Sequence, residues 1–323
     1  MKRAGVVVVP AYNEEQGLPA FVERLVALLA APGDATETEL SILIVDDGST
    51  DGTVAVVEAL AARHAAGPGR IALLSLTRNF GHQAAVAAGM LHASATADFV
   101  ITMDADGEHP IALIPELVAR WREGASIVHT ARRPNGKLPW TKRVASAGYY
   151  WLFARLSGLA VTPGMADFKL WDGELLRQVA PALPGCGSTR AFASWLAPRA
   201  PVVAYDQHVV EGRRSRFTGR KMWSLALGAI VRYSDVPLRL SILVGLVALL
   251  FAATLTAFVL WAAFTGRTVP GWASIILTIT IFGALQSFAI GILGEYLLRN
   301  WFRQSLPKFV VRGRGGRVST GPS

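Results

Sequence analysis

An uninterrupted apolar run that leads directly into two carboxylates constrains the fold of this chain most strongly. Residues 99–103 are uncharged and mostly apolar, and Asp104 and Asp106 follow with only Ala105 between them. Such a run, bounded by acids, predicts a buried strand of an α/β sheet. The two carboxylates would then lie at the C-terminal end of the strand, where open α/β sheets bind their ligands.

Two carboxylates this close together repel each other unless a cation lies between them. A hard divalent ion such as Mg²⁺ or Mn²⁺ is the usual solution, because it prefers oxygen ligands. A polar turn would explain the same residues, since Asp is common in turns. On its own this short pattern favours the turn, so the interpretation depends on the rest of the chain.

Strands and helices are predicted to alternate along the first 130 residues. The strand patterns cover residues 5–9, 41–45, 70–76, 98–103 and 125–130, and the helical patterns cover residues 15–31, 51–66, 82–95 and 111–122. This alternation is typical of a mostly parallel sheet with helices on both faces. No Gly-x-Gly-x-x-Gly follows the first strand, which argues against an ordinary dinucleotide-binding fold.

Polar residues also follow the first two predicted strands. The first strand ends in Pro10-Ala11-Tyr12-Asn13-Glu14, and the second ends in Asp46-Asp47-Gly48-Ser49-Thr50-Asp51. Because the carboxyl ends of parallel strands meet at one edge of a sheet, we expect both segments to lie beside Asp104 and Asp106. Ser49 and Asp51 also have the residue types that cap a helix.

Cysteine and histidine usage excludes two common kinds of site. The chain has one cysteine, Cys186, so neither an internal disulfide framework nor a cysteine-based metal site can form. This usage fits a reducing compartment for the soluble part. The six histidines include no His-x-x-x-His pair, which argues against a zinc site.

The positive net charge lies in the C-terminal third. Residues 207–323 carry 14 Lys or Arg and 3 Asp or Glu, whereas residues 1–206 carry 18 and 20. A basic region of this kind suggests that the chain binds nucleic acid or an anionic membrane surface.

Two charge-free stretches favour the membrane over nucleic acid. Residues 241–266 and 268–294 contain no charged side chain, and each is longer than the roughly 20 residues that a helix needs to span a bilayer. We predict two transmembrane helices at about 240–265 and 272–298, joined by a short turn. Basic residues flank the outer ends while the turn holds one arginine, so both termini are expected in the cytoplasm.

Several short motifs in a fixed order carry a resemblance to a known family. Pro-x-Tyr-Asn-Glu, Asp-Asp-Gly-Ser-x-Asp and Asp-Ala-Asp follow successive predicted strands. The chain thereby resembles the inverting nucleotide-sugar glycosyltransferases of family 2, which have the GT-A fold of nucleotide-diphospho-sugar transferases. Residues 78–85, 166–170, 215–217 with Lys221, and 291–296 resemble the branch that glycosylates polyprenyl phosphates. Dolichyl-phosphate mannosyltransferases and bactoprenol glucosyltransferases belong to this branch, and the resemblance extends to about residue 310.

The resemblance implies a role for individual residues. The positions that match the nucleotide-sugar pocket are Pro10, Tyr12, Glu14, Asp46, Asp47, Asp104, Ala105 and Arg132. Asp106, with Asp104 and Glu108, would hold Mg²⁺ or Mn²⁺; Glu108 stands where the family often has Gln. Asp104, Asp106 and Asp167 would be the catalytic residues.

A polyprenyl phosphate acceptor changes what those residues must do. The second ionisation of a phosphate monoester lies near roughly 6, so the attacking oxygen is already anionic at neutral pH. A strong general base is then not required, but a basic cradle is. Arg213, Arg216 and Lys221 would supply that cradle just before the membrane, and the same side chains would also suit anionic headgroups.

Asp167 has three alternative roles at this point. The resemblance implies that it matches the aspartate proposed as catalytic base. It could instead orient the acceptor or a basic partner, or it could serve the structure at the start of a strand. The nearby residues 185–190 depart from the family pattern, and Lys169 stands where the family often has Arg.

The sequence thus predicts four segments. A cytoplasmic GT-A catalytic domain would cover residues 1–212, an amphipathic interfacial helix 213–239, a transmembrane hairpin 240–298, and a basic cytoplasmic tail 299–323. The interfacial segment has one apolar face among basic residues, and packing on the catalytic domain would explain it equally well.

The predicted function is a metal-dependent, inverting hexosyltransferase (EC 2.4) at the cytoplasmic face of a bacterial inner membrane. It would move one sugar from UDP-glucose or another UDP-sugar to undecaprenyl or another polyprenyl phosphate. The alternatives are transfer to a sugar or protein hydroxyl, and a non-catalytic membrane scaffold with the same fold. A processive polysaccharide synthase is disfavoured, because the sequence contains no Gln-x-x-Arg-Trp motif. No nucleic-acid partner is expected, and the resemblance is compatible with a homo-oligomer.

Overall fold

The computed structural model describes residues 3–30, 38–65, 69–133, 164–206, 309–312 and 318–319, with single residues and short runs between 245 and 297. The chain divides into two compact units, each described here by itself. Unit 1 comprises Met1–Tyr150, Leu159–Arg216 and Pro307–Ser323, and unit 2 comprises Trp151–Gly158 and Phe217–Leu306. The predicted interfacial segment 213–239 and the predicted cradle residues Arg213, Arg216 and Lys221 lie outside the described residues.

Unit 1 is built on a seven-stranded sheet with the order β3-β2-β1-β4-β6-β5-β7. The strands are β1 (Arg3–Ala11), β2 (Thr38–Asp46), β3 (Ile71–Ser75), β4 (Phe99–Thr102), β5 (Ile127–Arg132), β6 (Met165–Asp172) and β7 (Val202–Tyr205). β6 runs antiparallel to both β4 and β5, whereas the other described pairs in this sheet are parallel. The prediction of an α/β fold with a mostly parallel sheet is therefore confirmed.

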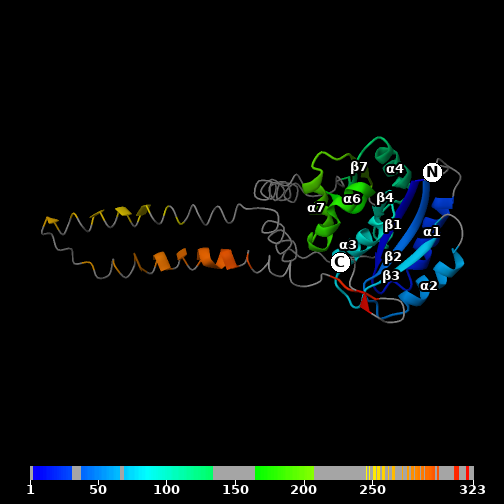
Figure 1. Cartoon of the computed structure of the whole chain (residues 1–323), viewed down its shortest axis with the longest axis horizontal. Coiled ribbons are helices and arrows are strands. Elements are labelled where there is room, and N and C mark those ends of the chain that lie inside the picture. Colours follow the sequence, from blue (N-terminus) through cyan, green and yellow to red (C-terminus); the bar gives the residue numbers. More distant parts are fainter. Residues whose placement is uncertain are drawn as a thin grey trace. The chain divides into compact units, whose positions relative to one another are not determined.

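Helices cover both faces of the sheet (Figure 1). The α-helices are α1 (Leu18–Ala30), α2 (Thr53–Arg63), α3 (His82–Ser94), α4 (Ile114–Arg122), α6 (Gly173–Val179) and α7 (Thr189–Leu196), and the 3₁₀ turns are η2 (Ile111–Leu113) and η3 (Ala180–Gly185). Each of the five predicted strands and four predicted helices is present, with shifted ends. α1 begins three residues later than expected, because the Glu15 carboxylate accepts a hydrogen bond from the Gly52 N–H at 3.0 Å and holds that segment as a loop.

The two faces of the sheet form two separate apolar clusters. Val7 and Val9 face α1, α2 and α4, whereas Val8 between them faces α3, α6 and α7. This alternation is the period-two pattern of a strand. All four residues of β4 are buried, because helices cover the strand from both sides. The apolar run 99–103 is therefore the central strand that its composition predicts.

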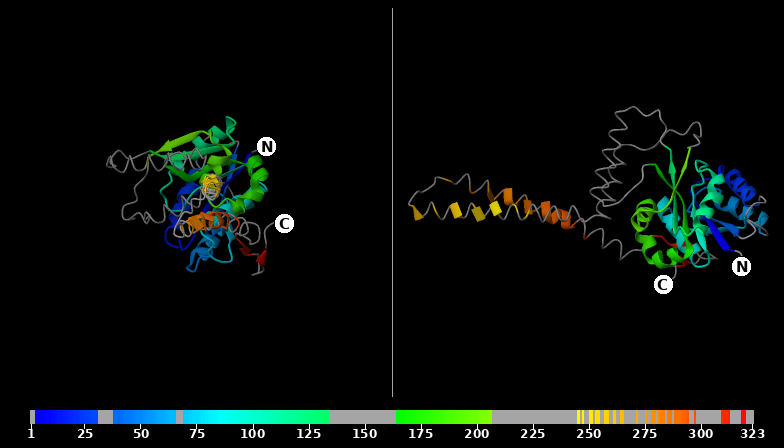
Figure 2. Two further views of the ribbon diagram at one scale, coloured as in Figure 1. Left: turned by 90° about the vertical axis from the view of Figure 1, so that its left-hand side faces the viewer. Right: turned by 90° about the horizontal axis from the view of Figure 1, so that it is seen from above.

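The C-terminal tail returns to unit 1. Its two short strands, β8 (Val311–Arg312) and β9 (Val318–Ser319), pair with each other and are red in Figures 1 and 2. Val311 also bridges to Leu76 just beyond the edge strand β3, and the Thr77 N–H donates to the Val310 carbonyl at 2.9 Å. Phe309 and Val311 pack on the cluster that contains α3. The tail thus covers part of an otherwise open sheet edge.

Unit 2 is described only at single residues and in short runs, the longest of which is 288–294. Most of the described residues between 245 and 297 are helical, and the rings of Phe251 and Phe282 stack with centroids 6.1 Å apart. Their large apolar side chains are mostly exposed, as at Phe264 and Phe288. Within the part of the chain that the structure describes, no helix has the length and apolar character required to cross a bilayer.

Candidate active site

The carboxyl ends of β1, β2 and β4 meet at one edge of the sheet. In the observed register Ala11 pairs with Asp46, and Val8 pairs with Thr102, two residues before Asp104. The Asp47 N–H donates to the Ala11 carbonyl at 2.9 Å, which joins the two loops that follow β1 and β2. The expected convergence of the three acidic segments is therefore confirmed.

The loop after β1 is fixed by the loop after β2. The Asn13 N–H donates to Ser49 Oγ at 3.0 Å, and Asn13 Oδ1 accepts from the Thr50 N–H at 2.9 Å. Asn13 has a positive φ of 53°, a conformation that Asn tolerates better than most residues. Among the predicted donor-binding residues, Pro10 is buried, whereas Tyr12 is 43% exposed beside this loop. The donor-binding roles of Pro10, Tyr12, Glu14 and Ala105 stay predictions.

Asp47 holds the loop that precedes α3. Its two carboxylate oxygens accept hydrogen bonds from the N–H groups of Phe80 and Gly81, at 2.8 and 2.9 Å. The side chain is buried, and burial raises its pKa although these two hydrogen bonds oppose the rise. Gly48 has a φ of 70° and packs on the backbone of Arg78, where a Cβ would lie 2.6 Å from the Arg78 Cα. The Asp-Asp-Gly motif therefore shapes the loop that carries His82, whereas sequence reasoning gave Asp47 a role in the nucleotide pocket.

Replacing Asp47 with alanine should destabilise unit 1 by about 2 kcal/mol, because two partly buried N–H groups lose their acceptors. Thermal unfolding of the purified chain measures the loss, and Asp47→Asn should cost less. Asp206→Ala is a matched control, since that carboxylate is 79% exposed. An unchanged melting temperature together with lost nucleotide affinity would instead support direct donor contact by Asp47.

Asp104 lies between two histidines. Its Oδ1 is 3.3 Å from His82 Nε2, and its Oδ2 is 3.7 Å from His109 Nε2. The Asp104 N–H donates to His109 Nδ1 at 3.1 Å, so Nδ1 is unprotonated and Nε2 carries the hydrogen of a neutral ring. Burial lowers the pKa of His109 to about 4, which agrees with this tautomer.

The Asp104 carboxylate is ready to accept a cation or a proton. Its Oδ1 is buried and accepts no hydrogen bond from the described residues. Burial raises the pKa of Asp104 to about 6, although the nearby His82 opposes the rise. His82 Nε2 lies 3.3 Å from this oxygen but forms no hydrogen bond to it, so a bound ligand could supply the contact that the buried oxygen lacks.

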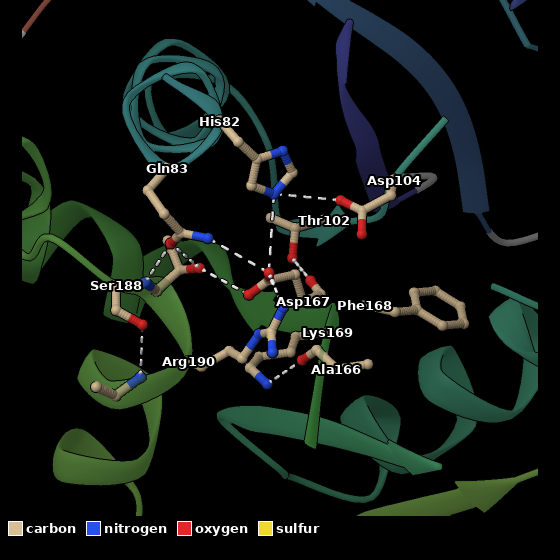
Figure 3. Close-up of polar contacts among 12 residues, drawn as sticks. His82, Gln83, Thr102, Asp104, Ala166, Asp167, Phe168, Lys169, Ser188 and Arg190 are labelled. Atoms are coloured by element: carbon tan, nitrogen blue, oxygen red, sulfur yellow. Dashed lines mark hydrogen bonds and ion pairs between the residues drawn. The ribbon is translucent and has the colours of Figure 1, made fainter. Parts of the chain in front are cut away.

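Asp167, on β6, lies at the centre of a polar network with side chains of α3 and α7 (Figure 3). Arg190 Nη2 lies 2.6 Å from Asp167 Oδ2, and Gln83 Nε2 donates to the same oxygen at 3.3 Å. His82 Nε2 is 3.7 Å from it, and Thr189 Oγ1 is 3.3 Å from Oδ1. Although burial raises the pKa of Asp167, the contacts from His82 and Arg190 outweigh that effect and hold the pKa well below its usual range.

Lys169 lies two residues further along β6 and is fully buried. Its Nζ donates to the Ala166 carbonyl at 2.5 Å. Burial lowers its pKa to about 7, while the negative charge of Asp167 opposes that shift. The Lys169 side chain supports the backbone around Asp167 from the interior of the protein. Because it is buried there, it does not face a substrate.

Arg132 and Glu108 form a second polar group at this edge. Arg132 Nη2 donates to Glu108 Oε2 at 2.9 Å, and its Nε donates to the Tyr205 hydroxyl at 3.3 Å. Both side chains are partly exposed. Asp106 lies in the turn before Glu108, where its Oδ1 accepts the Glu108 N–H at 3.0 Å.

The described residues contain one group that could hold a metal ion: His82, Asp104 and Asp167, with ligand atoms within 4.8 Å of one another. Asp167 fits that task poorly, because both of its oxygens already accept hydrogen bonds, Oδ2 from Arg190 and Gln83 and Oδ1 from Thr189. Asp104 fits well, since its buried Oδ1 accepts no hydrogen bond. Asp106 and Glu108 are not in the group, so their predicted roles as metal ligands stay predictions.

Sequence reasoning missed the side chains around Asp104 and Asp167: His82, Gln83, His109, Thr189 and Arg190. His82 and Gln83 lie inside the segment that resembles the polyprenyl-phosphate branch, but nothing in their spacing relates them to Asp167. The segment 185–190 was noted only as a departure from the family.

The chain is similar to several known proteins. Residues 6–170 match the family described as glycosyl transferase family 2. The chain is 30% identical to a prophage bactoprenol glucosyl transferase homolog of Escherichia coli K12 over 308 residues, covering 95% of this chain and 97% of the relative. It is also 30% identical to the bactoprenol glucosyl transferase of Shigella phage SfX, covering 95% and 98%. An uncharacterized glycosyltransferase of Synechocystis, sll0501, is 30% identical and covers 91% and 89%.

Proposed function

Because the chain belongs to glycosyl transferase family 2, in its polyprenyl-phosphate branch, we propose that it transfers one sugar from a nucleotide-sugar to a polyprenyl phosphate. Undecaprenyl phosphate is the proposed acceptor, and UDP-glucose or another UDP-sugar is the proposed donor. The names of the relatives from Escherichia coli and phage SfX, which match over nearly their whole length, support this acceptor and glucose as the sugar.

The observation that carries the proposal is the placement of Asp104. This carboxylate lies at the sheet edge where β1, β2 and β4 end, which is where open α/β sheets bind ligands. His82 contacts Asp104 on one side and the Asp167 network on the other. A donor held by the β1 and β2 loops and an acceptor near Asp167 would therefore meet beside Asp104.

A divalent ion, Mg²⁺ or Mn²⁺, fits the oxygen ligands at this edge. Asp104, Asp106 and Glu108 are the proposed ligands, and the buried Asp104 Oδ1 is the observation that favours an ion. When bound, such an ion supplies electrostatic stabilisation of the departing diphosphate. Arg132, which is partly exposed and held by Glu108 and Tyr205, is proposed to donate to the same phosphates.

The reaction proposed here needs no proton acceptor. A phosphate oxygen of the acceptor forms a bond to the anomeric carbon, and the bond from that carbon to the donor diphosphate breaks. The bonding electron pair leaves with the diphosphate, and inversion follows from attack opposite the leaving group. The acceptor oxygen is already anionic. The protein therefore has to bind and orient two anions, the acceptor phosphate and the donor diphosphate, while limiting the electrostatic repulsion between them.

We also propose that residues 240–298 form a transmembrane hairpin in a bacterial inner membrane, with the catalytic unit and both termini in the cytoplasm. The two charge-free stretches and the flanking basic residues support this placement. The exposed apolar side chains among the described residues of unit 2 also suit an apolar surround.

A panel of nucleotide-sugars, incubated with the full chain and undecaprenyl phosphate in detergent, tests the proposed function. We expect one UDP-sugar to give a glycosyl-phosphoryl lipid that mass spectrometry detects. Membranes from cells that lack the protein are the control. Sugar appearing on a glycan or protein hydroxyl instead would support the alternative acceptor class, and no turnover with any donor would favour the scaffold.

A further inference from the structure

A histidine and an arginine side chain, both partly exposed, contact one buried carboxylate. His82 and Arg190 both contact Asp167 Oδ2, with nitrogen atoms 3.7 and 2.6 Å away. Their side chains are 43% and 48% exposed, whereas the Asp167 side chain is 3% exposed. Asp167 therefore holds both side chains from the interior of the protein and is not itself open to a substrate.

The hydrogen-bond inventory of Asp167 argues against a role as general base. Besides Arg190 and His82, the carboxylate contacts the Gln83 amide and the Thr189 hydroxyl. Gln83 Oε1 in turn accepts the Thr189 N–H at 2.8 Å, so this amide connects α3 to α7. A carboxylate surrounded by donors is stabilised in its ionised form and has little tendency to take a proton.

The helices that carry His82 and Arg190 both begin beside Asp167. His82 and Gln83 are the first two residues of α3, and Thr189 and Arg190 are the first two residues of α7. The partial positive charge at each helix N-terminus adds to the charge of the Arg190 guanidinium and to the hydrogen-bond donor of the His82 ring. The result is a small surface that favours an anion, although Asp167 and Asp104 lie close to it.

We propose that His82 and Arg190 bind the phosphate group of the lipid acceptor, and that Asp167 and Gln83 are positioning residues that hold this pair. The inference rests on the proposed function and deepens it. Because both side chains contact the same carboxylate oxygen, one phosphate group can reach both of them. His82 also lies 3.3 Å from Asp104 Oδ1, so a phosphate at this pair lies next to the carboxylate assigned to the donor side.

Kinetics of the full chain, with undecaprenyl phosphate and donor varied separately, test the pair. His82→Ala and Arg190→Ala should each raise the KM for the acceptor about tenfold to a hundredfold, as expected for a lost charge-assisted hydrogen bond. The KM for the donor should stay within about twofold of the wild-type value. His92→Ala on the exposed side of α3 and Arg63→Ala on α2 are matched controls that should leave both constants unchanged.

The positioning role is tested by the pair Asp167→Asn and Arg190→Ala. If Asp167 acts through Arg190, Asp167→Asn raises the acceptor KM, and the double variant is no worse than Arg190→Ala alone. Gln83→Ala should produce a smaller rise in the same constant. If Asp167 is a base, Asp167→Asn lowers kcat, leaves the acceptor KM unchanged and removes the acidic limb of the pH–rate profile.

Three results would overturn the assignment. A rise in donor KM alone would mean that the pair binds the donor diphosphate. Loss of Mn²⁺ binding by His82→Ala, measured by electron paramagnetic resonance, would make His82 a metal ligand. Unchanged acceptor KM in both single variants, with the wild type active on the lipid, would refute the inference and leave the proposed function intact. An inactive wild type would instead refute the proposed function on which it rests.

Discussion

Replacing Asp106 with alanine should abolish sugar transfer while the chain stays folded. Asp106 lies in a turn beside Glu108 and is not one of the residues that form the two apolar clusters. If it holds a divalent ion that stabilises the departing diphosphate, its loss should lower kcat by at least about 10²–10³-fold, the usual cost of removing one transition-state stabiliser. Initial rates over a range of Mg²⁺ and Mn²⁺ concentrations provide the measurement.

Binding of Mn²⁺ separates this role from a general disturbance of the site. Asp106→Ala should bind Mn²⁺ more weakly by paramagnetic resonance, and its melting temperature should match the wild type. Glu58→Gln, an exposed acid on α2, is the control for charge alone. Turnover near the wild-type rate in Asp106→Ala would remove Asp106 from the metal site, and the group His82, Asp104 and Asp167 would then be the remaining candidate in the described part of the chain.

Replacing Gly89 with valine should lower the stability of unit 1 by about 3 kcal/mol, because α3 packs on the sheet through this position. A Cβ on Gly89 would overlap Val8 Cγ1 and lie 2.7 Å from Val45 Cγ2. Both valines are buried in strands that cannot move apart without breaking the sheet. The better helix propensity of valine over glycine recovers only a few tenths of a kcal/mol.

The same substitution should disturb the site at the far end of the helix. A shift of α3 displaces His82 and Gln83, so folded Gly89→Val protein should also lose transfer activity. Denaturant unfolding measures the stability, and Gly185→Val is the matched control, since a Cβ there meets nothing within 4 Å. Wild-type stability in Gly89→Val would show that α3 can move away from the sheet at little cost.

The sheet and its acidic edge could be predicted from the sequence, because both follow from patterns within short segments. The run 99–103 has the composition of a strand buried on both faces, and Asp104 and Asp106 follow it immediately. The positions of the strand ends then follow from the rule that parallel strands share a carboxyl edge. Neither step requires knowledge of a contact between distant residues.

The network around Asp167 could not be predicted in this way. Its contacts join residues that lie 84 positions apart, from Gln83 to Asp167, and 106 positions apart, from Gln83 to Thr189. They exist because β6 inserts antiparallel between β4 and β5 and brings Asp167 beside the start of α3. No periodicity or spacing in the sequence encodes that insertion.

Asp47 shows a different limit of sequence reasoning. The motif identified a carboxylate at the correct edge, but a carboxylate in a loop has two possible uses. The structure shows it accepting two backbone N–H groups, and only the positions of Phe80 and Gly81 reveal that use.

The return of the tail to unit 1 has a consequence for the order in which the chain can fold. Ribosomal synthesis runs from the N-terminus, so residues 217–306 of unit 2 emerge before Phe309 and Val311 exist. Until then, the edge beyond β3 and the apolar cluster around α3 stay without the residues that later cover them. The catalytic unit is therefore completed last, after the segment that interrupts it has been made.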